Sequence, residues 1–217
     1  MNRKKTIFLT SILVFIPMIV GLILWNKLPE QIPVHFNAAG DADQYGAKAF
    51  VVLGIPLLLW VLHLLSGFLI LADPKRQNIN DKVFLLILYT VPGVGIFSSV
   101  LMYPTALNIP VSVNMIGSLF VGIVFLFVGN YLPKSKQNYT VGIKLPWTLN
   151  DTENWNKTHR FAGVLWTLCG VALLISAFLE FILLAPILIA VAILLPTAYS
   201  FLFYIKKNGS NPENNAE

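Results

Sequence analysis

Polar and aromatic side chains suited to binding gather in one short stretch of an otherwise apolar chain. Residues 141–163 read VGIKLPWTLNDTENWNKTHRFAG and supply indole, imidazole, carboxylate, ammonium and guanidinium groups. Asn150 can cap a helix here, with a glutamate three residues later as in a capping box. Along that helix Trp155, His159 and Trp166 fall on one face, because four and eleven residues are nearly whole numbers of turns. We therefore predict an interfacial helix with a binding surface.

A second polar stretch, LPEQIPVHFNAAGDADQYGAK, occupies residues 28–48. His35, Asp41 and Asp43 are residue types that ligate metals, but a closed zinc site generally needs four ligands. We expect no metal and no cofactor, and predict a compact solvated loop that lies on lipid headgroups. The chain also has no His-Glu-x-x-His, no Gly-x-Ser-x-Gly and no paired intramembrane aspartates, so we do not expect an enzyme.

Composition places the chain in a membrane. Hydrophobic residues make up 56% of its 217 residues and charged residues only 12%, against about 25% charged residues in soluble domains. The net charge of +5 comes from residues that flank apolar runs, without a basic stripe interleaved with aromatics. Nucleic acid is therefore not an expected partner. The single cysteine, Cys169, excludes an internal disulfide and predicts a small buried side chain.

Six apolar segments are long enough to cross the hydrocarbon core, which takes about 20 helical residues. The sequence thus predicts an all-α bundle of six transmembrane helices, with the first retained as an anchor and kinks at prolines within the spans. The predicted spans are Thr6–Trp25, Ala49–Leu71, Val83–Tyr103, Ile109–Asn130, Phe161–Leu179 and Phe181–Tyr204. The predicted short interfacial helix precedes the fifth of these.

The distribution of Lys and Arg predicts the orientation of the bundle. Thirteen of these residues lie at the termini and in the second and fourth loops, whereas the first loop has only Lys27 and Lys48. By the positive-inside rule both termini are cytoplasmic and the first loop is extracytoplasmic. We predict two three-span halves and a disordered tail, namely residues 1–104 with outer loop 26–48, residues 105–207 with cytoplasmic loop 131–160, and residues 208–217.

The run NYTVGIKLPWTLNDTENWNKTHRFAG resembles the signature of SdpI-like immunity proteins, a family of bacterial multi-pass membrane proteins. The matching positions are Asn138, Gly142, Ile143, Pro146, Trp147, Thr148, Leu149, Trp155, His159, Arg160 and Gly163. Lys144 stands where the family usually has arginine, so the positive charge is kept but the bidentate guanidinium is lost.

The outer loop looks like the domain of unknown function that commonly precedes this signature. Leu28, Pro29, Ile32, Pro33, His35, Phe36, Gly40, Asp43 and Lys48 carry that second match. The two regions together span nearly the whole chain. The candidate site residues are the signature residues Asn138, Gly142, Lys144, Pro146, Trp147, Thr148, Leu149, Trp155, His159 and Arg160, and the loop residues Pro29, Pro33, His35, Gly40, Asp43 and Lys48.

The resemblance implies a non-enzymatic protein of the bacterial cell membrane that protects the cell against a secreted toxic peptide. It also implies signalling, in which a cytoplasmic transcriptional repressor is held at the membrane. The expected partners are the lipid bilayer, a toxic peptide on the outer face and such a repressor. A small transporter or exporter is the alternative, but ionisable groups are nearly absent from the spans, with His63 the one well inside.

Overall fold

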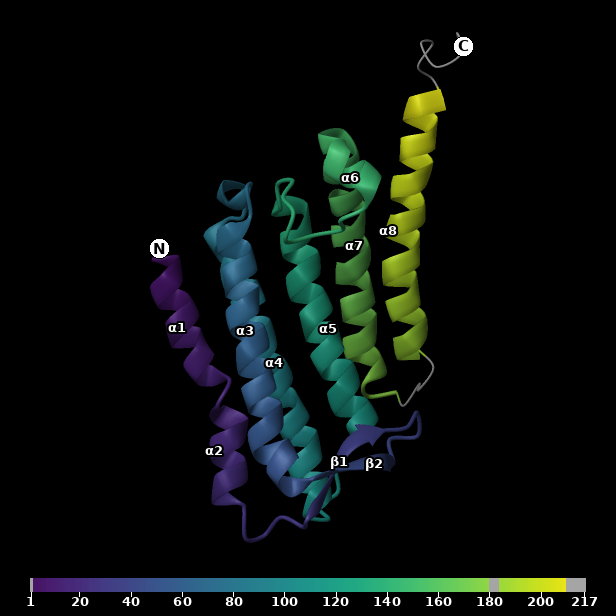
Figure 1. Ribbon diagram of the computed structural model, residues 1–217. Helices are drawn as coiled ribbons and strands as arrows, with labels where there is room; N and C mark the ends of the chain where they lie inside the picture. The colour runs from purple at the N-terminus through teal and green to yellow at the C-terminus, as the bar shows by residue number, and fades with distance from the viewer. Residues whose placement is uncertain (1, 180–183, 210–217) are drawn as a thin grey trace. The chain divides into compact units, whose positions relative to one another are not determined.

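The computed structural model describes residues 2–179 and 184–209, and within them six helical spans are long and apolar enough to cross a membrane (Figure 1). The helices are α1 (Arg3–Leu13), α2 (Ile16–Ile23), α3 (Ile55–Ala72), α4 (Asp81–Ala106), α5 (Val113–Tyr131), α6 (Pro146–Asn150), α7 (Thr152–Ser176) and α8 (Leu184–Gly209). The predicted multi-pass membrane protein is confirmed. Residues 181–183 of the predicted sixth span and 210–217 of the predicted tail lie outside the described residues.

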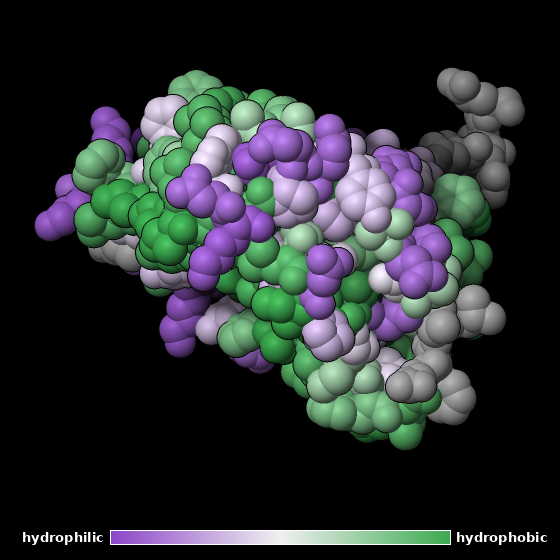
Figure 2. All heavy atoms as spheres, turned by 90° about the horizontal axis from the view of Figure 1, so that it is seen from below, coloured by the Kyte–Doolittle hydropathy of each residue, from purple (hydrophilic) through white to green (hydrophobic). Residues whose placement is uncertain are grey.

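The spans expose apolar side chains, as a lipid environment requires. Phe8, Ile23 and Phe68 are each more than 60% exposed, and hydrophobic residues occupy much of the surface seen in Figure 2. By its contacts the chain divides into two compact units. Unit 1 comprises residues 1–72 and 84–120, and unit 2 comprises residues 73–83 and 121–217.

A β-hairpin replaces the solvated loop predicted in unit 1, so the all-α prediction is wrong in this respect. Strands β1 (Gln31–Phe36) and β2 (Ala42–Ala47) pair antiparallel. The side chain of Asn37 closes the turn by accepting hydrogen bonds from the backbone N–H groups of Ala39 and Asp41. Gly40 follows in the turn with a φ of +91°, which a glycine adopts without strain. Such turn residues allow a short polar segment to fold back on itself.

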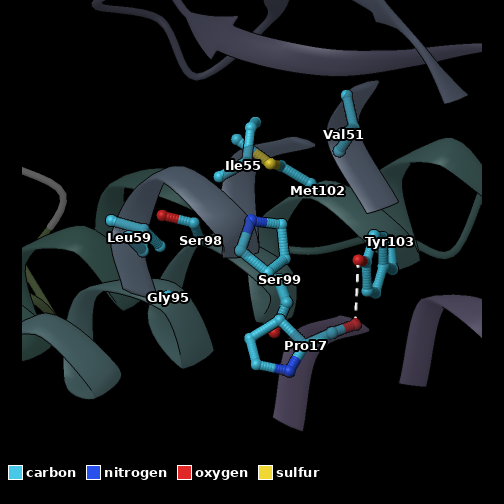
Figure 3. Close-up of a pocket in the computed structure, with 10 residues that line it drawn as sticks. Pro17, Val51, Ile55, Leu59, Gly95, Ser98, Ser99, Met102 and Tyr103 are labelled. Atoms are coloured by element: carbon cyan, nitrogen blue, oxygen red, sulfur yellow. Dashed lines mark hydrogen bonds between the residues drawn. The ribbon is translucent and has the colours of Figure 1, made fainter. Parts of the chain in front are cut away.

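Unit 1 packs the hairpin onto its helices through an apolar core. Leu28 and Ile32 meet Val51 and Val52, which belong to the π-helical segment η1 (Phe50–Gly54) at the start of the second span. Tyr103 joins this core from α4, and its hydroxyl donates a hydrogen bond of 3.0 Å to the carbonyl of Pro17, as Figure 3 shows. The adjoining cavity of about 10 Å³ has room for about one water molecule.

Proline distorts the first two spans, as predicted. The first span is divided into α1 and α2 just before Pro17, and η1 precedes Pro56 in the second. Pro92 and Pro196 lie inside α4 and α8. His63 is fully buried in the second span, and its Nε2 lies 3.0 Å from the Thr10 hydroxyl of α1. This hydrogen bond joins the first two spans, while the buried Nδ1 of His63 has no hydrogen-bond partner among the described residues.

Replacing Lys48 with methionine is expected to loosen the hairpin. The Lys48 ammonium is nearly buried and donates to the Leu28 carbonyl at 3.3 Å and to the Glu30 carboxylate at 2.7 Å. Methionine keeps the length but leaves a buried carbonyl unpaired, which costs about 1–3 kcal/mol. Protease sensitivity at the hairpin turn should rise, whereas Lys27→Met, at an exposed position, should leave it unchanged. Equal resistance to the protease in Lys48→Met and Lys27→Met would contradict this role for Lys48.

In unit 2, glycines let two helices approach closely. A side chain on Gly122 of α5 would meet the Gly170 carbonyl of α7, and a side chain on Gly170 would meet the Gly122 carbonyl. Cys169 is buried beside this crossing with Phe125 and Ala192, as the sequence predicted. α8 lies along α7 (Figure 1). This packing holds α5, α7 and α8 together below the segment that carries the signature residues.

Candidate functional site

The signature residues lie on a loop and two consecutive helices of unit 2. The signature loop, residues 135–145, leads from α5 and the short 3-10 turn η3 (Leu132–Lys134) into α6. The helix predicted to lead directly into the fifth span is the first part of α7, which runs without a break from Thr152 to Ser176, and its position at the membrane interface stays a prediction. The cap is one residue later than predicted. Asn150 ends α6, whereas Asp151 is extended and accepts hydrogen bonds from the backbone N–H groups of Glu153 and Asn154.

Asn138 holds the signature loop together from inside. Its side chain is fully buried. The amide oxygen accepts from the backbone N–H groups of Thr140 and Val141, at 2.9 and 2.7 Å, and the amide nitrogen donates to the carbonyls of Lys136 and Val141. One side chain thus replaces the backbone pairs that a loop lacks. An aspartate here would lose the donors, so the asparagine amide is specifically required.

His159 and Trp155 form the floor under this loop. Their rings stack with centroids 4.0 Å apart, and both side chains are buried. The Trp155 indole N–H donates to the Ser135 carbonyl at 2.8 Å. His159 Nδ1 lies 2.8 Å from the Trp155 carbonyl, while Nε2 accepts from the backbone N–H of Ile143 at 3.0 Å. Because Nδ1 must donate and Nε2 must accept, the imidazole is neutral in this geometry.

Gly142 is required where the loop crosses the two rings. Its φ of +123° lies in the region that favours glycine. A Cβ at this position would collide with Nε2 of His159 and would come within 3.0 Å of the Trp155 ring. The loop backbone therefore approaches the rings as closely as it does only because residue 142 has no side chain.

Thr148 and Pro146 start α6. The Thr148 hydroxyl accepts from the backbone N–H of Leu145 at 2.9 Å and lies 2.8 Å from the Ile143 carbonyl, to which it donates. Pro146 occupies the first turn, where a missing N–H leaves no hydrogen bond unmade. The Pro-Trp-Thr order of the signature thus begins a helix. Its threonine hydroxyl also hydrogen-bonds the last residues of the signature loop.

Trp147 joins α6 to a buried polar network between α7 and α8. Its indole N–H donates to the Ser200 hydroxyl at 2.8 Å, and that hydroxyl donates to the Asn154 amide oxygen at 2.7 Å. Thr158 donates to the same amide oxygen, and the Asn154 amide nitrogen donates to the Ser200 carbonyl. Every hydrogen-bonding atom named here has a partner, so the network stabilises one arrangement of the three helices.

Asp73, which directly follows α3 in the chain, accepts hydrogen bonds from the signature loop. Its side chain is buried, and Oδ2 accepts from the Tyr139 backbone N–H at 3.0 Å and from the Thr140 hydroxyl at 2.5 Å. Oδ1 accepts from the Lys75 backbone N–H at 2.7 Å. A carboxylate that accepts three such hydrogen bonds is a strong local anchor.

Gln137 links the segment that contains Asp73 to α6 through hydrogen bonds. Its amide nitrogen donates to the carbonyls of Thr148 and Leu149, both at 2.9 Å, at the end of the short helix. Its amide oxygen accepts from the Lys75 ammonium at 2.9 Å, and its backbone carbonyl accepts from the Asn78 amide. Residues 73–78 and the signature loop are therefore one hydrogen-bonded body.

Exposed positions remain around this buried core. Lys144, Pro146 and Arg160 are exposed, in contrast to Asn138 and His159. The signature therefore divides into residues that hold the loop and residues that can meet a partner. Trp166, predicted on the same face as Trp155, instead donates to the Ala192 carbonyl within the span.

The candidate residues of the outer loop lie in or beside the hairpin. His35 Nδ1 and Asp43 Oδ1 are 2.6 Å apart across the strands, and both side chains are substantially exposed. Pro33 is buried in β1, Pro29 is exposed before it, and Lys48 is buried behind β2. Among the residues that the structure describes, no cluster of three metal-ligating side chains occurs.

Acid should weaken the start of α7. Burial alone would raise the pKa of the Asp151 carboxyl, but hydrogen bonds from the Lys207 ammonium and from the backbone N–H groups of Glu153 and Asn154 lower it below the ordinary 3.8. A depressed folded pKa gives stability that is present above the unfolded pKa and is lost as pH falls through the folded value. Between pH 5 and about pH 3, Asp151→Asn should lose less thermal stability than the parent. Identical losses would exclude this ion pair as a cause.

Four residues of the site were not predicted from the sequence, namely Asp73, Gln137, Asn154 and Ser200. Asp73 and Ser200 lie far along the chain from the signature and belong to no short motif. Asn154 carried a weak signal, because it stands four residues before Thr158 on a helix face that proves to be buried.

The segments described above also match known protein families. Residues 134–200 match the SdpI/YfhL protein family, and residues 12–59 match a domain of unknown function, DUF1648. The chain is 28% identical over 214 residues to the Immunity protein SdpI of Bacillus subtilis (strain 168), an alignment that covers 95% of this chain and 99% of that protein. No solved structure matches it. The chain therefore matches the SdpI/YfhL family model in its C-terminal half and the DUF1648 model in its N-terminal half, and its predicted resemblance to the SdpI-like immunity proteins is confirmed.

Proposed function

We propose that this protein is a membrane immunity protein that protects a bacterial cell against a secreted toxic peptide. The observation that carries the proposal is the match of almost the whole chain to an immunity protein, together with the roles of the matched residues. Asn138, Gly142, Thr148 and His159 each hold the signature loop by a hydrogen bond or a close approach. These signature residues thus act together to stabilise the conformation of a single loop.

The proposed orientation places the hairpin outside the cell and the signature loop inside. It rests on the distribution of Lys and Arg, which also puts both termini in the cytoplasm. In this orientation the hairpin is the first part of unit 1 that a secreted peptide meets. The exposed Lys144 and Arg160 then face the cytoplasm, where a transcriptional repressor can dock and be held at the membrane.

Cysteine labelling should establish this orientation. With Cys169 replaced by alanine, single cysteines at Asn37 and Asn150 are both at exposed positions. An impermeant maleimide applied to intact cells should label the cysteine at 37 and should label the one at 150 only after the cells are opened. The reverse pattern would invert the topology and would place the signature loop outside.

Complementation tests the function itself. The chain is expressed in a Bacillus subtilis strain that lacks its own Immunity protein SdpI, and survival is measured beside toxin-producing cells. The parent should restore survival. Arg160→Lys keeps the charge but loses the guanidinium fork, and should impair repressor retention or protection at unchanged protein level. If Arg160→Lys and Arg160→Ala both behave as the parent does, the exposed cation is not a docking residue.

A further inference from the structure

A groove opens beside the signature residues on the side of unit 2 formed by α6, the start of α7 and the end of α8. Its volume is about 260 Å³, below the roughly 300–1,000 Å³ typical of drug-sized ligands. The residues that line it are Pro146, Trp147, Asn150, Asp151, Tyr204, Lys207 and Asn208. The volume suits a small polar group, and the lining combines two aromatic rings, two amides and one charge of each sign.

The two charges lie together on one wall. Lys207 Nζ lies 2.8 Å from Asp151 Oδ2 and 3.0 Å from Oε2 of Glu153, a carboxylate outside the groove lining, and the side chains of Lys207 and Asp151 are partly exposed. The lowered pKa of the carboxyl keeps Asp151 ionised at neutral pH. A ligand that carries one positive and one negative group can lie along such a pair without breaking it, because each ligand charge then meets its opposite. A ligand with only a negative charge would be repelled by Asp151 and by the neighbouring Glu153.

The position of the groove along α8 identifies the source of the ligand. Phe201, Leu202 and Ile205 on the same part of α8 are between 44% and 65% exposed, as lipid-facing residues are. Lys206 and Lys207 follow directly, in the last turn of α8. Trp147 and Tyr204 stack within the groove with ring centroids 5.8 Å apart, and such aromatic residues concentrate at the level of lipid headgroups. The groove is therefore continuous with the lipid-facing surface at the depth where headgroups lie.

We propose that this groove binds the headgroup of phosphatidylethanolamine. The primary ammonium donates hydrogen bonds to the Asp151 carboxylate, and the phosphate lies against the Lys207 ammonium, so that four charges alternate in sign. The amides of Asn150 and Asn208 supply further donors to the phosphate. Phosphatidylcholine lacks an N–H to donate, and phosphatidylglycerol has no cation for Asp151. The acyl chains remain outside the groove, along the apolar surface of α8.

The preference among headgroups tests this site on the unaltered protein. The full chain is reconstituted in nanodiscs that contain equal amounts of phosphatidylethanolamine, its N,N-dimethyl derivative, phosphatidylcholine and phosphatidylglycerol. Lipids that stay bound are counted by native mass spectrometry. Phosphatidylethanolamine should be retained about tenfold over phosphatidylcholine, since a hydrogen bond to a charged group contributes roughly that factor. The dimethyl lipid, with one N–H, should lie between them. Equal retention of phosphatidylethanolamine and phosphatidylcholine, or of phosphatidylethanolamine and phosphatidylglycerol, would overturn the proposal.

Substitutions in the groove test whether the preference for phosphatidylethanolamine arises there. Asp151→Asn keeps a residue that caps helices well but removes the charge, and should bring retention of phosphatidylethanolamine down to that of phosphatidylcholine. Lys207→Met should lower retention of every phospholipid that binds through its phosphate. Lys206→Met, outside the lining, should change nothing. A full preference in Asp151→Asn would contradict the site. This proposal is independent of the immunity function, which survival measures separately.

Discussion

Replacing Gly142 with alanine should abolish the native signature loop and, with it, protection. Alanine at a φ of +123° is strained, and its Cβ would collide with His159 and press on Trp155. Backbone strain and overpacking each cost about 1–3 kcal/mol, so a loss of roughly 2–6 kcal/mol is expected. In detergent the variant should melt at a lower temperature, and protease should cut within residues 135–145, which remain protected in the parent.

Gly117→Ala is the matched control for this change. Gly117 is helical and has no atom near the position of an added Cβ, so alanine there should be neutral or slightly stabilising. Because the six apolar spans determine insertion, Gly142→Ala should still reach the membrane. Normal melting and normal protection in Gly142→Ala would show that the loop does not need its close approach to the rings.

Replacing Asp73 with alanine is expected to release the signature loop from the segment that follows α3. The change leaves the Tyr139 N–H and the Thr140 hydroxyl without their acceptor. Hydrogen bonds to charged groups contribute about 1.5–3 kcal/mol each, so a loss of roughly 3 kcal/mol is expected. The Tyr139 amide should exchange its hydrogen faster in the variant, whereas amides in the middle of α8 should not.

A double-mutant cycle separates this contact from general damage. Thr140→Val alone removes one hydrogen bond, and in the Asp73→Ala background it should have little further effect, because the two groups bond to each other. Losses that simply add would show that Asp73 and Thr140 act independently, and would contradict this hydrogen bond.

The spans could be predicted because membrane insertion depends on long apolar runs, which are local features of a sequence. Thr6–Trp25 and Ala49–Leu71 agree closely with the helices observed. The hairpin could not be predicted with equal ease, because its strands are short, contain Pro33, and are stabilised by the Asn37 turn and by packing on Val51 and Val52. Propensity is weak evidence for such a segment.

The interior of the candidate site was only partly predictable. Asn138 and Gly142 were named from the family resemblance alone, and His159 also from its helical spacing with Trp155, but neither source gives contacts. Their hydrogen bonds depend on where a loop crosses a helix, and spacing alone does not fix that crossing. His159 was predicted at an exposed binding surface but is buried, because Gly142 lets the backbone of the signature loop cover it. Asp73 was missed, since only the folded chain brings it to the loop.

Survival of toxin-exposed cells tests the central claim most directly. A Bacillus subtilis strain that lacks its own Immunity protein SdpI is given the parent chain, Gly142→Ala or Gly117→Ala at matched membrane levels, and surviving cells are counted beside a toxin producer. We predict that the parent and Gly117→Ala restore survival and that Gly142→Ala does not. Death of cells that carry the parent chain at normal membrane levels would contradict the immunity function, and survival with Gly142→Ala would contradict the role of the signature loop.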